Sequence, residues 1–202
     1  MVFLFKALRK LFYKLSGGLY TPLAKLNLFL NGANVGSGLD VRGFIWVMVT
    51  SRGSMKIGSN LRLNSGPSFN VIGRQQKCIF WVEGDLTIGS NVGMSATAII
   101  CNHSIAIGDN VIIGGNTVIY DTDFHSLDPK QRCDKQLDRN NAQWGPVVIE
   151  DNVFIGAHST ILKGVRIGQN SIIGGCSVVT KNIQPNEVWA GNPAVFIKRL
   201  TP

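Results

Sequence analysis

The sequence predicts an all-β fold, a parallel β-helix, because its apolar residues recur with a period of six. Aliphatic residues stand at Ile107, Ile113 and Ile119. An isolated strand alternates with a period of two and an α-helix with a period of 3.6, so neither element explains this spacing. In a hexapeptide repeat, each group of six residues forms one short strand and one corner, and the aliphatic side chain points into the core.

The residue types between these isoleucines suit tight corners. Gly108 and Gly114 directly follow the first two isoleucines, and Asn110 and Asn116 come two residues after each glycine. Glycine and asparagine adopt left-handed backbone conformations that branched residues resist. We therefore expect short strands joined by narrow turns.

The repeat continues in both directions from this stretch. It begins irregularly near residues 39–41, is recognisable at Ile57 and Ile88, and is degenerate between them, with an excursion at residues 66–77. After the stretch it resumes regularly, with aliphatic residues at Ile149, Ile155, Ile161, Ile167, Ile173 and Val179. We expect three hexads to form one coil, with coils stacked about 4.8 Å apart through backbone hydrogen bonds.

The repeat stops at His125 and resumes only at Ile149. A loop insertion is therefore predicted at about residues 121–148. Local sequence rules are most often broken at functional sites, so this histidine loop is where we expect chemistry.

The two ends of the chain lack the repeat, so the sequence predicts three parts. Residues 1–30 form a basic amphipathic helical segment that is interrupted at Gly17–Gly18. Residues 31–184 form the β-helix domain, and residues 185–202 fold back as a C-terminal cap. Two roles stay open for the first segment. It contacts an anionic membrane through residues 1–16, or it packs over the open end of the β-helix.

The composition favours a folded protein in a reducing compartment. Among 202 residues, 45% are hydrophobic and 16% are charged, which is unlike a disordered chain. The four cysteines are widely spaced and form no CxxC pair, so we expect neither a disulfide framework nor a metal cluster, and a cytoplasmic location. We find no convincing signal peptide and no apolar run long enough to cross a bilayer.

The basic character of the chain predicts an anionic partner other than nucleic acid. The net charge is +8 and the pI is about 9.6. No dense run of lysine and arginine with interleaved aromatic residues occurs beyond the N-terminal segment, so no nucleic acid is expected. An anionic cofactor or an anionic membrane surface accounts for the charge equally well.

Three features together resemble the hexapeptide-repeat acyltransferases, and most closely the branch of galactoside, maltose and polysaccharide O-acetyltransferases. These features are the hexads, the DTDFHSLDP stretch at residues 121–129 and the AGNPA motif at residues 190–194. The resemblance implies a left-handed β-helix, whereas the general rule for parallel crossovers favours a right-handed one. It also implies a homotrimer with acetyl-CoA, as co-substrate, in the groove between neighbouring subunits.

The resemblance assigns the role of general base to His125. Imidazole suits this role because it exchanges a proton readily near neutral pH. Asp121 and Asp123 are expected to fix the imidazole tautomer or to hold sugar hydroxyls, unless they only cap turns. His103 is expected at a corner, with a structural or substrate-binding role, and His158 at an outward, solvated position.

The resemblance places the CoA arm along the late coils and its phosphates near basic groups at the C-terminus. The matching positions are Ala157, Gly175, Thr180, Lys181 and Lys198. Small residues leave room for the pantetheine arm, and lysines attract phosphate.

The sequence departs from the galactoside and maltose enzymes at acceptor-binding positions. Met94 and Ala96 stand where those enzymes carry asparagines, which argues against their small soluble sugars as acceptors. Val195 stands where a basic residue often occurs, which weakens the expected nucleotide contacts.

The predicted function is transfer of an acetyl group from acetyl-CoA to a sugar hydroxyl, in surface polysaccharide or lipid-linked glycan biosynthesis. The alternatives are acetylation of serine or of an amino-sugar nitrogen, and a non-catalytic trimeric scaffold. A zinc enzyme of this fold needs three converging histidines with a close-spaced ligand pair, which the sequence lacks, so no metal is expected.

Overall fold

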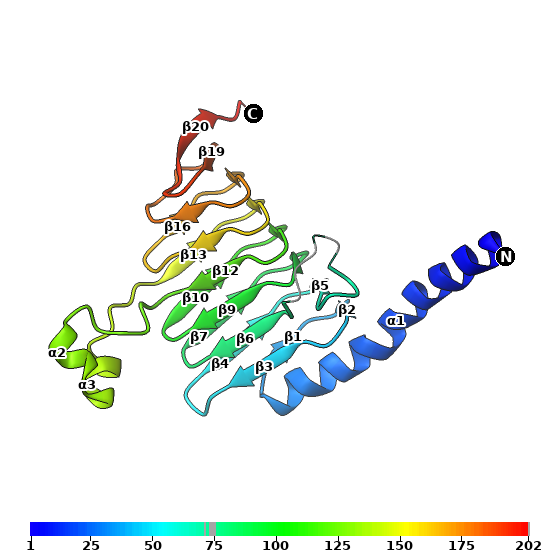
Figure 1. Cartoon of the computed structure of the whole chain (residues 1–202), viewed down its shortest axis with the longest axis horizontal. Coiled ribbons are helices and arrows are strands. Elements are labelled where there is room, and N and C mark those ends of the chain that lie inside the picture. Colours follow the sequence, from blue (N-terminus) through cyan, green and yellow to red (C-terminus); the bar gives the residue numbers. More distant parts are fainter. Residues whose placement is uncertain (71, 73–75, 202) are drawn as a thin grey trace.

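The computed structural model describes residues 1–70, 72 and 76–201, and within them it shows a parallel β-helix of six coils (Figure 1). A long helix lies at one end of the β-helix and a two-stranded hairpin at the other. Residues 71 and 73–75, which belong to the predicted excursion, lie outside the described residues.

Three parallel sheets form the sides of the β-helix, and each contributes one strand to every coil. The first sheet contains β1 (Asn34–Val35), β4 (Ser54–Ile57), β7 (Asp85–Ile88), β10 (Ser104–Ile107), β13 (Val147–Ile149) and β16 (Arg166–Ile167). The second contains β2 (Asp40–Arg42), β5 (Arg62–Asn64), β8 (Gly93–Ser95), β11 (Ile112–Ile113), β14 (Phe154–Ile155) and β17 (Ile172–Ile173). The third contains β3 (Trp46–Val49), β6 (Ile79–Val82), β9 (Ala98–Cys101), β12 (Val118–Tyr120), β15 (Thr160–Ile161) and β18 (Val178–Val179). The hexads of the sequence therefore correspond to successive sides of the coils.

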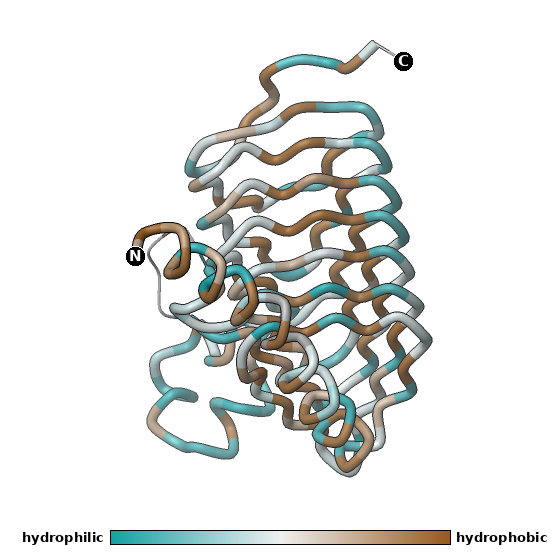
Figure 2. Tube along the Cα trace, turned by 90° about the vertical axis from the view of Figure 1, so that its right-hand side faces the viewer, coloured by the Kyte–Doolittle hydropathy of each residue, from teal (hydrophilic) through white to brown (hydrophobic). Residues whose placement is uncertain are grey.

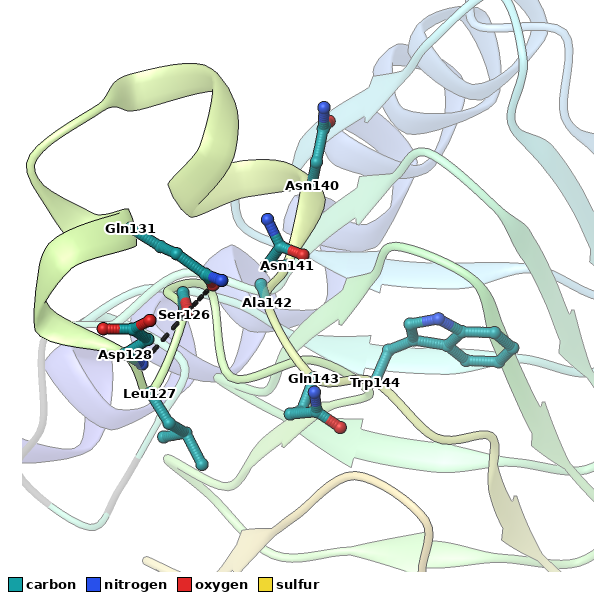
Figure 3. A pocket seen from close by; sticks show the side chains of 9 residues that line it. All are labelled: Ser126, Leu127, Asp128, Gln131, Asn140, Asn141, Ala142, Gln143 and Trp144. Carbon is teal, nitrogen blue, oxygen red and sulfur yellow. Dashed lines mark hydrogen bonds between the residues drawn. The ribbon is translucent and has the colours of Figure 1, made fainter.

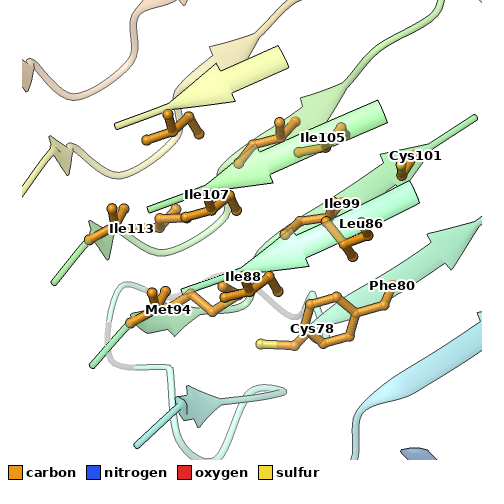
Figure 4. Packing of buried hydrophobic residues seen from close by; sticks show 14 of the residues in the cluster. Cys78, Phe80, Leu86, Ile88, Met94, Ile99, Cys101, Ile105, Ile107 and Ile113 are labelled. Atoms are coloured by element: carbon orange, nitrogen blue, oxygen red, sulfur yellow. The ribbon is translucent and has the colours of Figure 1, made fainter. Parts of the chain in front are cut away.

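The core consists of columns of aliphatic side chains that run along the axis. Ile88 pairs with Ile107, and Ile107 pairs with Ile149 one coil further on. Met94 and Ile113 form the equivalent pair in the second sheet, and all of these side chains are buried. Figure 4 shows members of these columns above one another, and Figure 2 shows the apolar segments repeating from coil to coil. Burial of each such side chain contributes about 1.5–3 kcal/mol to the free energy of folding.

The corner between the first and second sheets is held by a ladder of asparagines. Each of them has φ between 58° and 63°. Each side-chain Nδ2 donates to the Oδ1 of the next asparagine, over 2.9–3.2 Å. The asparagine ladder comprises Asn60, Asn91, Asn110, Asn152, Asn170 and Asn186. Asparagine thus supplies both the left-handed backbone and a polar contact between coils.

One long insertion leaves the coils after β12 and returns at β13. It carries two short helices, α2 (Pro129–Arg132) and α3 (Lys135–Asn140). Asp128 and Asp134 cap them by accepting hydrogen bonds from backbone N–H groups of the first turn. The insertion, called the histidine loop below, projects from the side of the β-helix (Figure 1).

Helix α1 (Val2–Leu30) is continuous, so the predicted break at Gly17–Gly18 is wrong. A glycine within a helix costs about 1 kcal/mol relative to alanine, which does not end a helix held by other contacts. The last third of α1 is held on the first coil, where Leu28 is buried and Thr21 Oγ1 accepts a hydrogen bond from Val41 N. Its N-terminal part extends away from the body of the molecule (Figure 1). No helix in the described part of the chain is long and apolar enough to cross a membrane.

The C-terminal segment covers the last coil. Strand β19 (Glu187–Ala190) pairs in parallel with β17, and β20 (Val195–Arg199) pairs antiparallel with β19. Ala194 is buried against this end of the core.

Replacement of an asparagine in the ladder tests its two contributions separately. Asn110→Ala should lower the free energy of unfolding by about 1–2 kcal/mol, because alanine lacks the short polar side chain that lets asparagine adopt φ 58°, and because the ladder is cut. Asn110→Gly removes the ladder contact alone, so it should lose less than the alanine variant. The measurement is thermal unfolding of both variants. Equal losses in the two variants would show that the backbone conformation is not strained.

Candidate active site

The site is built around a hydrogen bond between a histidine and an aspartate within the histidine loop. His125 Nδ1 lies 2.7 Å from Asp138 Oδ2, which belongs to the first turn of α3. The imidazole is 68% exposed, whereas the carboxylate is 15% exposed. This arrangement fixes one ring nitrogen and leaves the other, Nε2, available for proton transfer.

Further contacts hold Asp138 and the backbone around His125 in place. The second carboxylate oxygen of Asp138 accepts a hydrogen bond from Ser126 N at 2.7 Å. Ser126 Oγ donates to Gln131 Oε1 at 2.6 Å, as shown in Figure 3. Arg132 Nη1 donates to the carbonyl oxygens of Ser126 and Leu127. The short helices thus position the histidine although the loop lacks the repeat.

The pKa of Asp138 is lowered from its ordinary value. The hydrogen bond with His125 is the largest cause, followed by the hydrogen bond from Ser126 N. The charges of His125 and Arg132 act in the same direction. Asp138 is therefore ionised at neutral pH and acts as a fixed negative charge beside the imidazole.

The two aspartates that the sequence placed beside His125 have other partners. Asp121 is fully buried and accepts hydrogen bonds from the backbone N–H groups of residues 102, 103 and 104 at 2.7–2.8 Å. Asp123 Oδ1 lies 2.9 Å from Lys163 Nζ. Asp121 therefore holds a corner of the previous coil, and Asp138 orients the imidazole in place of either predicted residue.

Sequence reasoning missed Asp138 because it stands thirteen residues after His125. The acidic residues between His125 and β13 are Asp128, Asp134 and Asp138. The first two cap helices, which leaves Asp138 for the histidine. This elimination requires the helix boundaries, which the six-residue period does not supply.

The other two histidines lie apart from this pair. The His103 ring stacks on Trp144 of the histidine loop, with ring centroids 4.2 Å apart and an interplanar angle of 16°. His158 occupies a corner at φ 63°, where its Nδ1 lies 3.3 Å from Asn116 Nδ2. Among the described residues, no three His, Cys, Asp or Glu side chains are grouped as a metal site requires.

Two cysteines, Cys78 and Cys101, are buried in the core, and their thiols are unreactive. Burial raises the pKa of Cys78 to about 11. It likewise raises the pKa of Cys101 to about 12, and the charge of Asp121 adds to this effect. Thiols with such pKa values form little thiolate at neutral pH.

The predicted cofactor residues lie at the far coils but not at one point. Ala157 and Gly175 are stacked in adjacent coils, and a β-carbon on Gly175 would lie 3.2 Å from Ala157 O. Thr180 and Lys181 follow β18, and Lys198 lies on β20 opposite Val188. Ala157 and Gly175 thus lie on a different side of the C-terminal coils from the lysines.

The acceptor positions that differ from the galactoside and maltose enzymes are closed to solvent. Met94 is 2% exposed and Ala96 is fully buried. Neither side chain presents a group to a ligand in this chain.

Two hollows flank the histidine loop. The smaller, of about 440 Å³, lies within the loop between Ser126 and Trp144 (Figure 3). The larger, of about 830 Å³, lies between the loop and the corners where the third sheet leads into the first. We call the larger hollow the aromatic cleft; its lining includes Arg52, Trp81, Glu83, His103, Arg139 and Trp144.

The repeat matches known family models over two stretches. Residues 146–181 match the bacterial transferase hexapeptide model (six repeats), and residues 83–121 match the hexapeptide repeat of succinyl-transferase. These matches and the three-sided coil place the chain among the left-handed parallel β-helix proteins, which confirms the predicted fold.

Individual relatives narrow the class. Galactoside O-acetyltransferase of Escherichia coli (strain K12) is 35% identical over 130 residues, which cover 59% of this chain and 61% of that protein. A maltose O-acetyltransferase from Clostridium difficile 630 is 31% identical, with a TM-score of 0.52, over 84% of this chain and 70% of that one. A hexapeptide-repeat acetyltransferase of Vibrio cholerae O1 biovar eltor, complexed with acetyl coenzyme A, is 25% identical, with a TM-score of 0.59, over 96% and 85%.

The chain belongs to the hexapeptide-repeat acetyltransferases, in the branch of the galactoside and maltose O-acetyltransferases. It spans 44% to 61% of the length of the first curated relatives that it matches.

The lowered pKa of Asp138 predicts how the histidine loop responds to pH. A depressed pKa in the folded state adds stability above the ordinary carboxyl value of about 3.9, and this stability is lost as pH falls through the folded value. Asp138→Asn should therefore lower the melting temperature at neutral pH, and the gap to the wild type should close in acid. Thermal unfolding over a pH series measures this gap. A gap that is the same at every pH would contradict the assignment.

Proposed function

We propose that the protein is an acetyl-CoA-dependent O-acetyltransferase that acts on a hydroxyl group of a sugar. The observation that carries this proposal is the contact between His125 and Asp138, an exposed imidazole held by a largely covered carboxylate. This is the arrangement that general-base catalysis requires. The names of the E. coli and C. difficile relatives supply the reaction class and the sugar acceptor.

In the proposed reaction, His125 Nε2 accepts the proton of the acceptor hydroxyl as its oxygen attacks the thioester carbonyl of acetyl-CoA. Asp138 keeps the proton of the neutral imidazole on Nδ1 and stabilises the imidazolium that forms. When the tetrahedral intermediate collapses, the carbon–sulfur bond breaks, the acetyl ester remains on the sugar, and the proton passes from Nε2 to the departing CoA sulfur. Backbone N–H groups are the expected donors to the intermediate oxygen.

The arrangement of the predicted residues supports a site shared between subunits of a homotrimer. His125 follows β12, whereas Ala157 and Gly175 lie where the second sheet leads into the third. These positions are at opposite ends of the strands of the third sheet, the small residues before the strands and the histidine after them. A CoA arm laid along Ala157 and Gly175 of one subunit would therefore meet the histidine of a neighbouring subunit. Lys198 of the same subunit, on β20, would then lie near its phosphates, whereas Thr180 and Lys181, which follow β18, would lie at the opposite ends of the third-sheet strands, where the histidine loop leaves the coils.

The contact between His125 and Asp138 also distinguishes this proposal from the alternatives. A non-catalytic scaffold has no need for an exposed histidine fixed by a lowered-pKa carboxylate. Serine and amino sugars remain alternative acceptors, because a general base can remove a proton from any of these hydroxyl or amino groups.

His125→Ala should reduce acetyl transfer about 10²–10⁴-fold, the range for loss of a general base. The measurement is CoA release from acetyl-CoA with a panel of sugars. CoA should still raise the melting temperature of the variant, because the histidine acts on the acceptor proton and not on CoA affinity. His158→Asn, which keeps the corner conformation, is the matched control and should stay within a few-fold of the wild type. Equal activity of the two variants would remove His125 from the mechanism.

We further infer that α1 lies on an anionic membrane surface, with its docking surface extending beyond the predicted residues 1–16. Eight exposed leucines recur along the helix at spacings of three or four. This leucine stripe comprises Leu4, Leu8, Leu11, Leu15, Leu19, Leu23, Leu26 and Leu30. It runs roughly 40 Å at 1.5 Å per residue.

The leucine stripe and the capping contacts lie on different faces of α1, so the two roles predicted for this segment are compatible. Tyr20 contacts Phe44 and Phe69, and Leu28 is buried on the first coil. Neither residue belongs to the stripe. Lys6, Arg9 and Lys10 flank the stripe, and no acidic residue precedes Asp40, so the helix complements an anionic surface. Such docking would hold the enzyme at the inner face of the cytoplasmic membrane, where surface polysaccharide and lipid-linked glycans are made.

Leu8→Glu together with Leu15→Glu should abolish sedimentation with vesicles of phosphatidylcholine and phosphatidylglycerol. Binding of the intact protein should weaken as salt rises, since each basic residue near the surface contributes about 1 kcal/mol. Leu137→Glu, at an exposed position on α3, is the control and should bind like the wild type. A double variant that stays vesicle-bound would refute the docking surface. A change of oligomeric state without vesicle binding by the intact protein would show that the stripe joins subunits.

A further inference from the structure

Two tryptophans, Trp81 of the second coil and Trp144 of the histidine loop, line the aromatic cleft, and Trp46 packs against Trp81. The Trp46 and Trp81 rings have centroids 5.5 Å apart, and Trp144 stacks on His103 at 4.2 Å. Trp144 nevertheless stays 55% exposed and Trp46 stays 43% exposed. Grouped exposed aromatic side chains on a rigid scaffold mark a binding surface more often than isolated ones do.

Polar contacts fix the wall of the aromatic cleft. Trp81 Nε1 donates to Glu83 Oε1 at 3.1 Å, and Arg139 Nη2 donates to Glu83 Oε2 at 2.7 Å. Glu83 belongs to the second coil and Arg139 to α3, so this pair ties the histidine loop to the body. The cleft therefore has a defined width before any ligand enters.

Other polar side chains in the cleft are free to bind a ligand. Arg52, Asn102 and Asn140 line it, and within the described part of the chain their side chains make no hydrogen bond or ion pair with protein groups. They offer guanidinium and amide groups, which both suit hydroxyl oxygens. Indole faces beside such groups suit a sugar ring, which has apolar faces and a rim of hydroxyls.

The length of the cleft indicates more than one sugar. Its lining comes from the corners after the first, second and third coils, at Arg52, Glu83 and His103. Two spacings between coils amount to about 10 Å. The volume of about 830 Å³ lies in the upper part of the range for ligand pockets.

The aromatic cleft also adjoins the histidine. Phe124, which precedes His125, and Arg139, which follows Asp138, both line it. A ligand in the cleft therefore lies against the two segments that carry the proposed base and its partner.

We propose that the aromatic cleft binds an oligosaccharide acceptor of at least two sugar units. One ring stacks on Trp144 near the histidine, and the next stacks on Trp81 towards Arg52. This proposal rests on the proposed sugar O-acetyltransferase activity, since it names the acceptor of that site. It also agrees with the buried Met94 and Ala96, which leave acceptor recognition to other side chains.

The test is direct binding of saccharides to the full chain, measured by saturation-transfer NMR. The panel contains glucose, galactose, N-acetylglucosamine and glucuronic acid, with their di- and trisaccharides. At least one series should bind about tenfold more tightly as a disaccharide than as a monosaccharide, a gain of about 1.4 kcal/mol. Trp81→Ala should remove this gain, and Trp144→Ala should weaken every member of the series. The exposed Leu137→Ala on α3, outside the cleft, is the control and should leave binding unchanged.

Several results would overturn the proposal. One is saccharide binding that is equally tight for mono-, di- and trisaccharides. Another is saccharide binding by the Trp81→Ala and Trp144→Ala variants that equals that of the wild type. The third is CoA binding without binding of any saccharide in the panel. Loss of CoA affinity in Trp144→Ala would assign the cleft to the donor, and dissociation of the oligomer would assign it to a contact between subunits. If CoA fails to stabilise the wild type while saccharides bind as expected, the transferase proposal fails and the glycan site stands.

Discussion

The structure depends on one constraint, the hydrogen bonding of every strand to the equivalent strand one coil away. This pairing holds coils about 4.8 Å apart and places each residue above the same position of the previous coil. A side chain that fits one coil must therefore fit the next, as in the column from Ile88 through Ile107 to Ile149. Aliphatic side chains fill the interior and asparagines hold one corner, and the six-residue period is the consequence.

The same constraint leaves little freedom for chemistry inside the coils. A catalytic side chain needs specific hydrogen-bond partners of its own. A side chain in a column must instead fit against the equivalent side chains of the coils above and below it. The histidine loop escapes this requirement because it leaves the coils after β12 and is built from its own helices. His125, Asp138 and Arg139 all belong to it, while the coils supply Glu83 and His103 as fixed points.

The period of six predicted the strands and the position of the loop, because strand pairing repeats the same local rule in every coil. It could not predict Asp138, whose contact with His125 depends on where α3 begins. Local glycine content predicted a break in α1 that the contacts of Leu28 and Thr21 with the first coil override. The tryptophan cluster was also beyond sequence reasoning, because its members come from two coils and the loop, and their spacing along the chain has no period.

The asparagine ladder has a direction as well as a stabilising role. From Asn60 to Asn170 every side chain donates towards the C-terminal end, so these amide dipoles point the same way and add along the axis. The row ends with the N–H groups of Asn186, at the end of the molecule where β20 carries Lys198 and Arg199. This corner of the β-helix thus carries an aligned row of side-chain dipoles, and an anion approaching its C-terminal end meets the positive end of that row together with Lys198, while Arg199 is paired with Glu187.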